Sequence, residues 1–138
     1  MAERPTRRVL VLVRDLFFGG RIESAVRRLG GEVELIRAKD QVSAQLDRLG
    51  AGLLLVDLSA RSVDWAELIR EATTRPEAIR PRVVAFGPHL EGNLHKSARA
   101  AGADQTLANS AFTEQLPKLL VAFLGEDEEL SETLTSSP

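Results

Sequence analysis

Residues 53–59 read LLLVDLS, in which four consecutive aliphatic residues end on Asp57. A short aliphatic run without polar interruption suits a β-strand that is buried on both faces, as the inner strands of a parallel sheet are. Two similar runs, VLVLV at 9–13 and VVAF at 83–86, lie on either side of it along the chain. We therefore expect a parallel sheet that is covered by helices on both faces.

The segment after the first run has the spacing of an amphipathic helix. The pair Gly19-Gly20 predicts a loop, and apolar residues then recur at positions 22, 25, 26 and 29 until Gly30-Gly31 ends the helix. A shorter and partly alternating strand is expected at 33–36, with the character of an edge strand.

Each later strand is also followed by a predicted helix. A short polar side chain at a helix start accepts a hydrogen bond from a first-turn N–H. The residues that meet this description are Asp40, Asp64 and Thr113, the last with Pro117 in its first turn. An Ala-rich helix is expected at 91–101 and a fifth strand at 105–108. The alternation predicts a doubly wound α/β domain with helices on both faces.

Composition narrows the class of protein. A chain of 138 residues, 43% hydrophobic and 28% charged, makes one globular domain. Its formal net charge of -2 gives no reason to expect nucleic acid or a membrane surface as a partner. It has no cysteine, and no apolar run approaches the roughly 18 residues of a membrane span. We expect a cytoplasmic domain at 8–124, with a short arm at 1–7 and an acidic, disordered tail at 125–138.

The strand ends locate the candidate site, because doubly wound sheets bind ligands at the carboxyl ends of their strands. The residues that this rule selects are Arg14, Asp15, Asp57, Gly87, His89 and Asn109. His89 and His95, the two histidines, are six residues apart, which is not the helical spacing of metal ligands. We expect both on the surface, with His89 nearer the rim of the site.

Over roughly residues 8–124 the chain resembles the receiver domain of two-component response regulators. Two stretches carry the resemblance: LLLVDLS, which puts Asp57 at the phosphoacceptor position, and ARAAGADQTLANSAF at 98–112. The resemblance implies a flavodoxin-like, three-layer α/β/α sandwich of five strands in the order 2-1-3-4-5 with five helices. It also implies phosphoryl transfer onto Asp57 from a histidine kinase or a small donor, with magnesium.

Three residues depart from the pattern of that family. Arg14 replaces one of two acidic residues, which leaves Asp15 and Asp57 as the carboxylates for a metal; Gly87 replaces a Thr or Ser, and Asn109 replaces a Lys. Charge-assisted hydrogen bonds contribute about 1.5–3 kcal/mol each, so these losses weaken the stabilisation of a phosphoryl group. We therefore expect a non-enzymatic, degenerate receiver without a cofactor, with Mg²⁺ bound only if Asp57 is active.

The sequence leaves two alternatives open at each of two positions. Asp57 is either an inherited phosphoacceptor or a strand-end aspartate that accepts backbone N–H groups. The guanidinium of Arg14 either pairs with Asp57, as a counter-ion in place of magnesium, or points to solvent.

The leading functional hypothesis is a stand-alone degenerate receiver that acts as a signalling and protein-interaction module. Its partner would be a histidine kinase, an output protein or a second copy, bound through the fourth helix, fifth strand and fifth helix. The residues expected at that interface are Leu94, Ala98, Ala101, Phe112 and Leu116. The alternatives are an active single-domain response regulator that accepts phosphate on Asp57 with Mg²⁺, and a flavodoxin-like domain that binds a small anionic or nucleotide ligand.

Overall fold

The fold comes from a computed structural model, which describes residues 7–48, 51–61, 63–89 and 92–124. The predicted tail at 125–138 and nearly all of the predicted arm lie outside the described residues. Strands and helices alternate along the described chain: β1 (Arg8–Leu12), α1 (Leu16–Arg28), β2 (Glu32–Leu35), α2 (Lys39–Arg48), β3 (Leu53–Asp57), α3 (Trp65–Thr73), β4 (Arg82–Gly87), α4 (Gly92–Ala101), β5 (Gln105–Ala108) and α5 (Asn109–Leu124).

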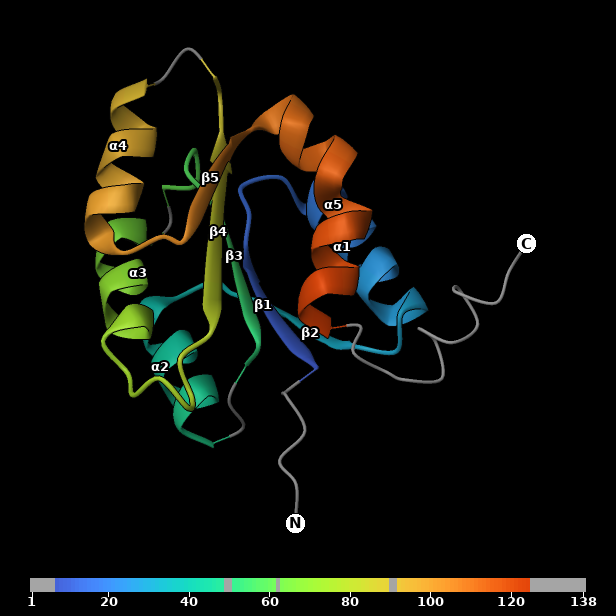
Figure 1. The fold of residues 1–138 in the computed structure, drawn as a ribbon, viewed down its shortest axis with the longest axis horizontal. Helices are drawn as coiled ribbons and strands as arrows, with labels where there is room; N and C mark the ends of the chain where they lie inside the picture. Colours follow the sequence, from blue (N-terminus) through green and yellow to red (C-terminus); the bar gives the residue numbers. More distant parts are fainter. Residues whose placement is uncertain (1–6, 49–50, 62, 90–91, 125–138) are drawn as a thin grey trace.

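The strands form one parallel sheet in the order β2-β1-β3-β4-β5. Helices α1 and α5 cover one face of this sheet, and α2, α3 and α4 cover the other (Figure 1). The predicted fold class, a doubly wound α/β sandwich with strand order 2-1-3-4-5, is confirmed. No helix in the described part of the chain is long and apolar enough to cross a membrane.

Two hydrophobic cores lie on the two faces of the sheet. In β1, Leu10 and Leu12 face the core under α2, α3 and α4, whereas Val9 and Val11 face the core under α1 and α5. The central strand β3 is buried at every position. This double burial explains the uninterrupted aliphatic runs, because neither face of these strands meets water. The edge strands β2 and β5 are only half-buried.

Helix α1 begins earlier than predicted, and the expectation of a loop at Gly19-Gly20 is wrong. Asp15 caps the helix by accepting a hydrogen bond from the Phe17 N–H at 2.9 Å, so both glycines lie inside α1. A Cβ on Gly19 would come within 3.0 Å of Val13 Cγ2. Glycine here therefore allows the helix to approach the end of β1 closely, and it does not mark a turn.

The starts of two other helices also differ from prediction. Asp64 caps α3 as expected, accepting from the Glu67 N–H at 3.3 Å. Asp40, in contrast, lies inside α2. The Gln41 side chain accepts instead from the N–H groups of residues 37 and 38, at 2.7 and 3.2 Å. Gln41 therefore ties the chain just before the helix to its first turn, which is not the capping of a first-turn N–H that was predicted for Asp40.

Helix α5 follows β5 without a loop, so it starts at Asn109 and not at Thr113. The Thr113 hydroxyl is inside the helix and donates to the Asn109 carbonyl at 3.0 Å. Pro117 then falls in the helix interior and not in its first turn. Since proline has no N–H, one intrahelical hydrogen bond of α5 is missing there.

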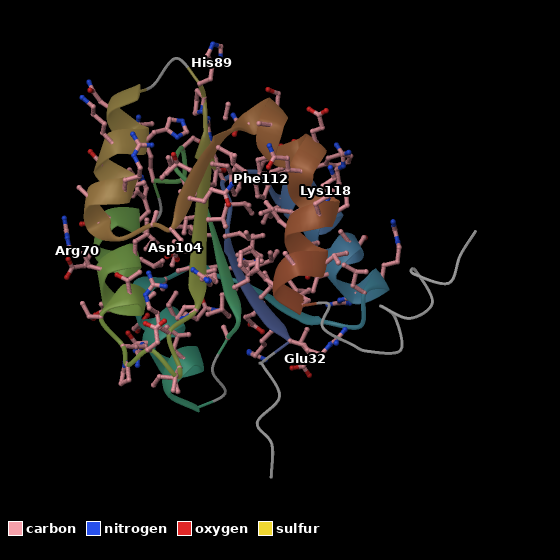
Figure 2. The ribbon with its side chains drawn as sticks, in the orientation of Figure 1. Glu32, Arg70, His89, Asp104, Phe112 and Lys118 are labelled. Carbon is pink, nitrogen blue, oxygen red and sulfur yellow. The ribbon has the colours of Figure 1, made fainter. Side chains whose placement is uncertain are left out.

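The residues expected at a partner interface are mostly part of the two cores. Ala98, Ala101, Phe112 and Leu116 are buried, and Leu94 packs against the core under α2, α3 and α4. Figure 2 shows Phe112 on the side of α5 that faces the sheet. This corrects their assignment to an exposed surface: their apolar character serves helix-to-sheet packing.

Candidate functional site

A cavity of about 670 Å³ opens at the carboxyl edge of the sheet, over the ends of β1, β3 and β4. Its walls come from α1 on one side and from the start of α5 on the other. The residues that line it are Arg14, Asp15, Phe17, Phe18, Arg21, Asp57, Ser59, Phe86, Asn109 and Thr113. Four of the six predicted site residues, namely Arg14, Asp15, Asp57 and Asn109, are therefore brought together.

Asp57 ends β3 and is only 7% exposed, the one charged residue that is buried in the described part of the chain. Its Oδ2 accepts the Arg14 backbone N–H at 2.9 Å. Its Oδ1 accepts both the N–H and the hydroxyl of Ser59, at 2.9 and 2.6 Å. A buried carboxylate requires such partners, and these donors occupy three of its roughly four acceptor positions.

This arrangement arises locally from the end of the strand. The chain turns directly after β3, and the Ala60 N–H bonds back to the Asp57 carbonyl at 3.0 Å. The same turn brings Ser59 under the carboxylate, which is the short-range side-chain-to-backbone pairing that aspartate favours in turns. The structure thus shows the backbone-accepting geometry considered for Asp57, at the position where the resemblance puts a phosphoacceptor.

Arg14 contacts Asp57 through its backbone and not through its guanidinium. The residue is exposed, and within the described residues no ion pair joins its side chain to Asp57. Of the two alternatives for Arg14, the pairing of guanidinium with carboxylate is therefore not formed. The side chain lines the cavity instead.

Asp15 and Asp57 do not fit the magnesium ion that the resemblance implies. Mg²⁺ requires near-ideal octahedral oxygen coordination. One Asp15 oxygen is committed to the cap of α1, and Asp57 accepts three hydrogen bonds. Two guanidiniums, those of Arg14 and Arg21, line the same space. Within the described ranges, no three acidic or histidine side chains gather where they could hold a metal.

Gly87 is buried at the end of β4, and the space that a side chain would need is filled. An ideal Cβ on Gly87 would lie 3.2 Å from the Cβ of Leu58. Leu58 packs in the core under α2, α3 and α4, so it cannot be displaced without loss of apolar contact. A side chain at position 87 would therefore press against Leu58, which would have to shift by a few tenths of an ångström to admit it.

His89 does not reach the cavity, contrary to the expectation that it lies near the rim. It is exposed beyond the end of β4 (Figure 2). Together with His95, Lys96 and Arg99 it borders a second, shallower groove of about 470 Å³ over α4 and β5. His95 is half-buried there, with its Nε2 3.1 Å from the Pro88 carbonyl oxygen.

Sequence reasoning missed the aromatic part of the cavity. Phe17, Phe18 and Arg21 come from α1, and the assumption of a loop at 19–20 hid their common face. Positions 14, 17 or 18, and 21 have helical spacing, which is the signal that would have revealed them. Phe18 meets Phe86 edge-on, with centroids 5.7 Å apart at 71°.

A three-ring cluster forms beneath this wall. Phe86 and Phe112 stack with their centroids 3.9 Å apart and their planes at 8°. Phe18 approaches Phe112 edge-on at 5.9 Å and 68°. Since the rings come from α1, β4 and α5, the cluster ties both walls of the cavity to the sheet.

Comparison with solved structures identifies the fold. The chain superposes on the receiver domain of a response regulator from Bermanella marisrubri with a TM-score of 0.67 and 22% identity, covering 83% of this chain and 98% of that one. The receiver domain of a sensor histidine kinase from Pseudomonas aeruginosa PAO1, which holds magnesium in its active-site cleft, gives a TM-score of 0.71 and 20% identity. The match covers 88% of this chain and 99% of that one. A receiver domain protein from Methanospirillum hungatei JF-1 gives a TM-score of 0.65 and 17% identity, covering 85% of this chain and 95% of that one.

The chain therefore has the fold of response-regulator receiver domains. No protein-family model matches its sequence, and no curated protein matches it.

Proposed function

We propose that this chain is a degenerate receiver module, which signals through protein contacts and does not accept a phosphoryl group on Asp57. The observation that carries the proposal is the set of partners around this carboxylate. All three are neutral donors, supplied by the Arg14 backbone and by Ser59. They hold the side chain in place without a metal.

The missing cations support the same conclusion. Transfer of a phosphoryl group to a carboxylate brings two anions together, so metal ions or fixed cations must neutralise the transition state. The magnesium ligands do not fit, Asn109 is neutral, and Gly87 carries no hydroxyl and has Leu58 packed close to it. Each of the groups that the receiver family uses for this purpose is therefore absent or obstructed.

The proposed partner is another protein in the cytoplasm, a histidine kinase, an output protein or a second copy of this chain. The net charge of -2 argues against nucleic acid. On the face of α4, β5 and α5, contact would have to come from exposed residues such as Lys96 and Arg99, because the apolar residues first expected there are buried. The module is not proposed to be an enzyme.

Incubation with acetyl phosphate and Mg²⁺, followed by intact-mass spectrometry, tests the proposal. Wild type and Asp57→Asn are compared over the same time course, beside a receiver domain known to be active as the positive control. We expect neither protein to gain the mass of a phosphoryl group. A phosphorylated species in wild type that Asp57→Asn lacks would establish the rival function, an active single-domain response regulator.

A beryllofluoride titration supplies a second readout that does not depend on the lifetime of an acyl phosphate. NMR spectra of the ¹⁵N-labelled protein should keep the resonances around Asp57 in place when beryllofluoride and Mg²⁺ are added. Saturable shifts centred on Asp57 would contradict the proposal.

A further inference from the structure

We propose that the cavity over Asp57 binds a small aromatic anion, a planar ring that carries a carboxylate or phosphate group, without forming a covalent bond. This inference rests on the proposed function, because it gives the module a reversible ligand in place of the phosphoryl group. It follows from three properties of the lining: its unused hydrogen-bond donors, its exposed aromatic surface and its size.

The donors that remain free in the cavity are mostly cationic. Within the described residues, the guanidiniums of Arg14 and Arg21 form no hydrogen bond or ion pair, and neither does the Asn109 amide. Most of the acceptor capacity of Asp57 is already used by three bonds, and one Asp15 oxygen caps α1. Unused capacity of this kind is matched by an anion, and guanidinium binds carboxylate or phosphate through two parallel bonds.

The same cavity exposes aromatic surface. Phe17 is 78% exposed on its wall, and the neighbouring Leu16 is 62% exposed. The half-buried Phe18 adds ring surface deeper in the cavity, and behind it lies Phe86, which is almost fully buried. Large apolar side chains that gather beside a polar cleft are typical of a binding site, and aromatic rings favour a planar ligand through stacked or edge-on contacts.

Size and position agree with a small-molecule site. The volume of about 670 Å³ lies within the roughly 300–1,000 Å³ of ligand pockets. The cavity also lies where the strand order reverses, between β1 and β3, which is where doubly wound sheets bind their ligands. Its lining comes from both α1 and α5, so a bound ligand would bridge two helices on one face of the sheet.

Isothermal titration calorimetry with three probes tests the proposal on the full chain. The probes are 1-naphthoate, its neutral isostere 1-naphthamide, and inorganic phosphate. We expect naphthoate to bind at least about tenfold more tightly than either of the others, because only it offers both the charge and the ring. Equal affinity for naphthoate and naphthamide, or no heat from naphthoate at millimolar concentration, would overturn the proposal.

Matched variants locate the site. Arg21→Gln should raise the Kd for naphthoate roughly tenfold, since it removes one charge-assisted contact. Arg28→Gln makes the same change on the exposed last turn of the same helix, outside the cavity, and should leave the Kd unchanged. Phe17→Ala should raise the Kd for naphthoate but leave the Kd for phosphate unchanged. Equal effects of the two arginine variants would contradict the assignment to this cavity.

The two proposals fail in different ways. Phosphorylation of Asp57 by acetyl phosphate overturns the proposed function, whatever naphthoate does. Absence of both phosphorylation and naphthoate binding overturns only the ligand site and leaves the protein-contact module standing.

Discussion

Asp57 and Asp104 lie at opposite ends of the same sheet, and the two carboxylates are held in different ways. Asp104, in the turn between α4 and β5 (Figure 2), receives both Arg80 amino groups at 3.1 Å and the Val83 N–H at 2.8 Å. Asp57 has neutral donors only. One carboxylate is paired with a cation, whereas the other is buried without one, beside two guanidiniums that have no partner among the described residues.

The difference indicates what each end of the sheet does. At the amino end, the charge of Asp104 joins the starts of β4 and β5, with Arg80 also donating to the carbonyls of Pro81 and Gly102. That cluster is complete in itself. At the carboxyl end, cations and carboxylates line one cavity, and among the described residues they do not pair with each other. The guanidiniums there can therefore still bind a ligand.

The largest expected effect is at the amino end. Asp104→Ala removes the carboxylate partner of Arg80, which keeps only its two carbonyl acceptors, and leaves the Val83 N–H without its acceptor. We therefore expect a loss of about 2–3 kcal/mol in the free energy of unfolding, measured by urea denaturation. Glu114→Ala removes an exposed carboxylate from α5 and should change stability by less than about 0.5 kcal/mol. If the two variants were equally stable, the arginine cluster would not stabilise the sheet.

At the carboxyl end, Gly87→Thr tests whether Leu58 occupies the place of the missing hydroxyl. We expect a loss of about 1–2 kcal/mol on unfolding, because the added side chain overlaps Leu58. A double-mutant cycle with Leu58→Ala checks the cause, since the penalty of the threonine should shrink in that background. An unchanged penalty would show that the strain lies elsewhere.

A third change sharpens the electrostatic contrast. Arg14→Asp removes a guanidinium from the cavity and adds a carboxylate beside Asp15 and Asp57, so it should tighten Mg²⁺ binding at least about tenfold, or roughly 1.4 kcal/mol. Calorimetric titration with MgCl₂ measures this, with Arg28→Asp as the control for net charge. Wild type that bound Mg²⁺ as tightly as Arg14→Asp would contradict the assessment that its residues do not fit the ion.

The smallest effect is expected at Asp57 itself. Asp57→Asn removes a buried charge that no cation balances, which stabilises the fold. It also weakens the hydrogen bonds to the side chain, although one oxygen remains to accept from the backbone, so the two effects nearly cancel. The free energy of unfolding should change by less than about 1 kcal/mol. A loss as large as that of Asp104→Ala would mean that Asp57 is mainly a structural residue, and the contrast between the two ends would disappear.

The fold could be predicted because its strands are unambiguous. Aliphatic runs such as 53–56 are buried on both sides, so burial and sequence agree residue by residue. Helix starts were harder to predict, because capping depends on which residue is the first of the helix. Asp40 has a high capping preference but lies inside α2, and Gln41 accepts from the N–H groups of two residues just before the helix. Local preference alone does not decide such choices.

Only those site residues that directly follow a strand were predicted. Arg14, Asp15 and Asp57 follow strands and were found, whereas Phe17 and Arg21 were missed because Gly19-Gly20 suggested a loop. Gly19 is explained by the close approach of α1 to Val13, a tertiary contact that no local pattern reveals, whereas nothing in the structure explains Gly20. The prediction of the interface residues failed for a related reason, since an apolar residue on a helix can pack in the core as well as against a partner.

The position of β3 also has a consequence for the order of folding. Leu54 pairs with Leu10 on one side and with Val83 on the other. A nascent chain that has just completed β3 already has β1 available, but the second partner, β4, is still to be synthesised. Until it emerges, the most apolar strand keeps an open edge, and contacts so distant in sequence form slowly. We therefore expect partly folded chains in which β4 has not yet joined the sheet to be those most prone to strand pairing between molecules.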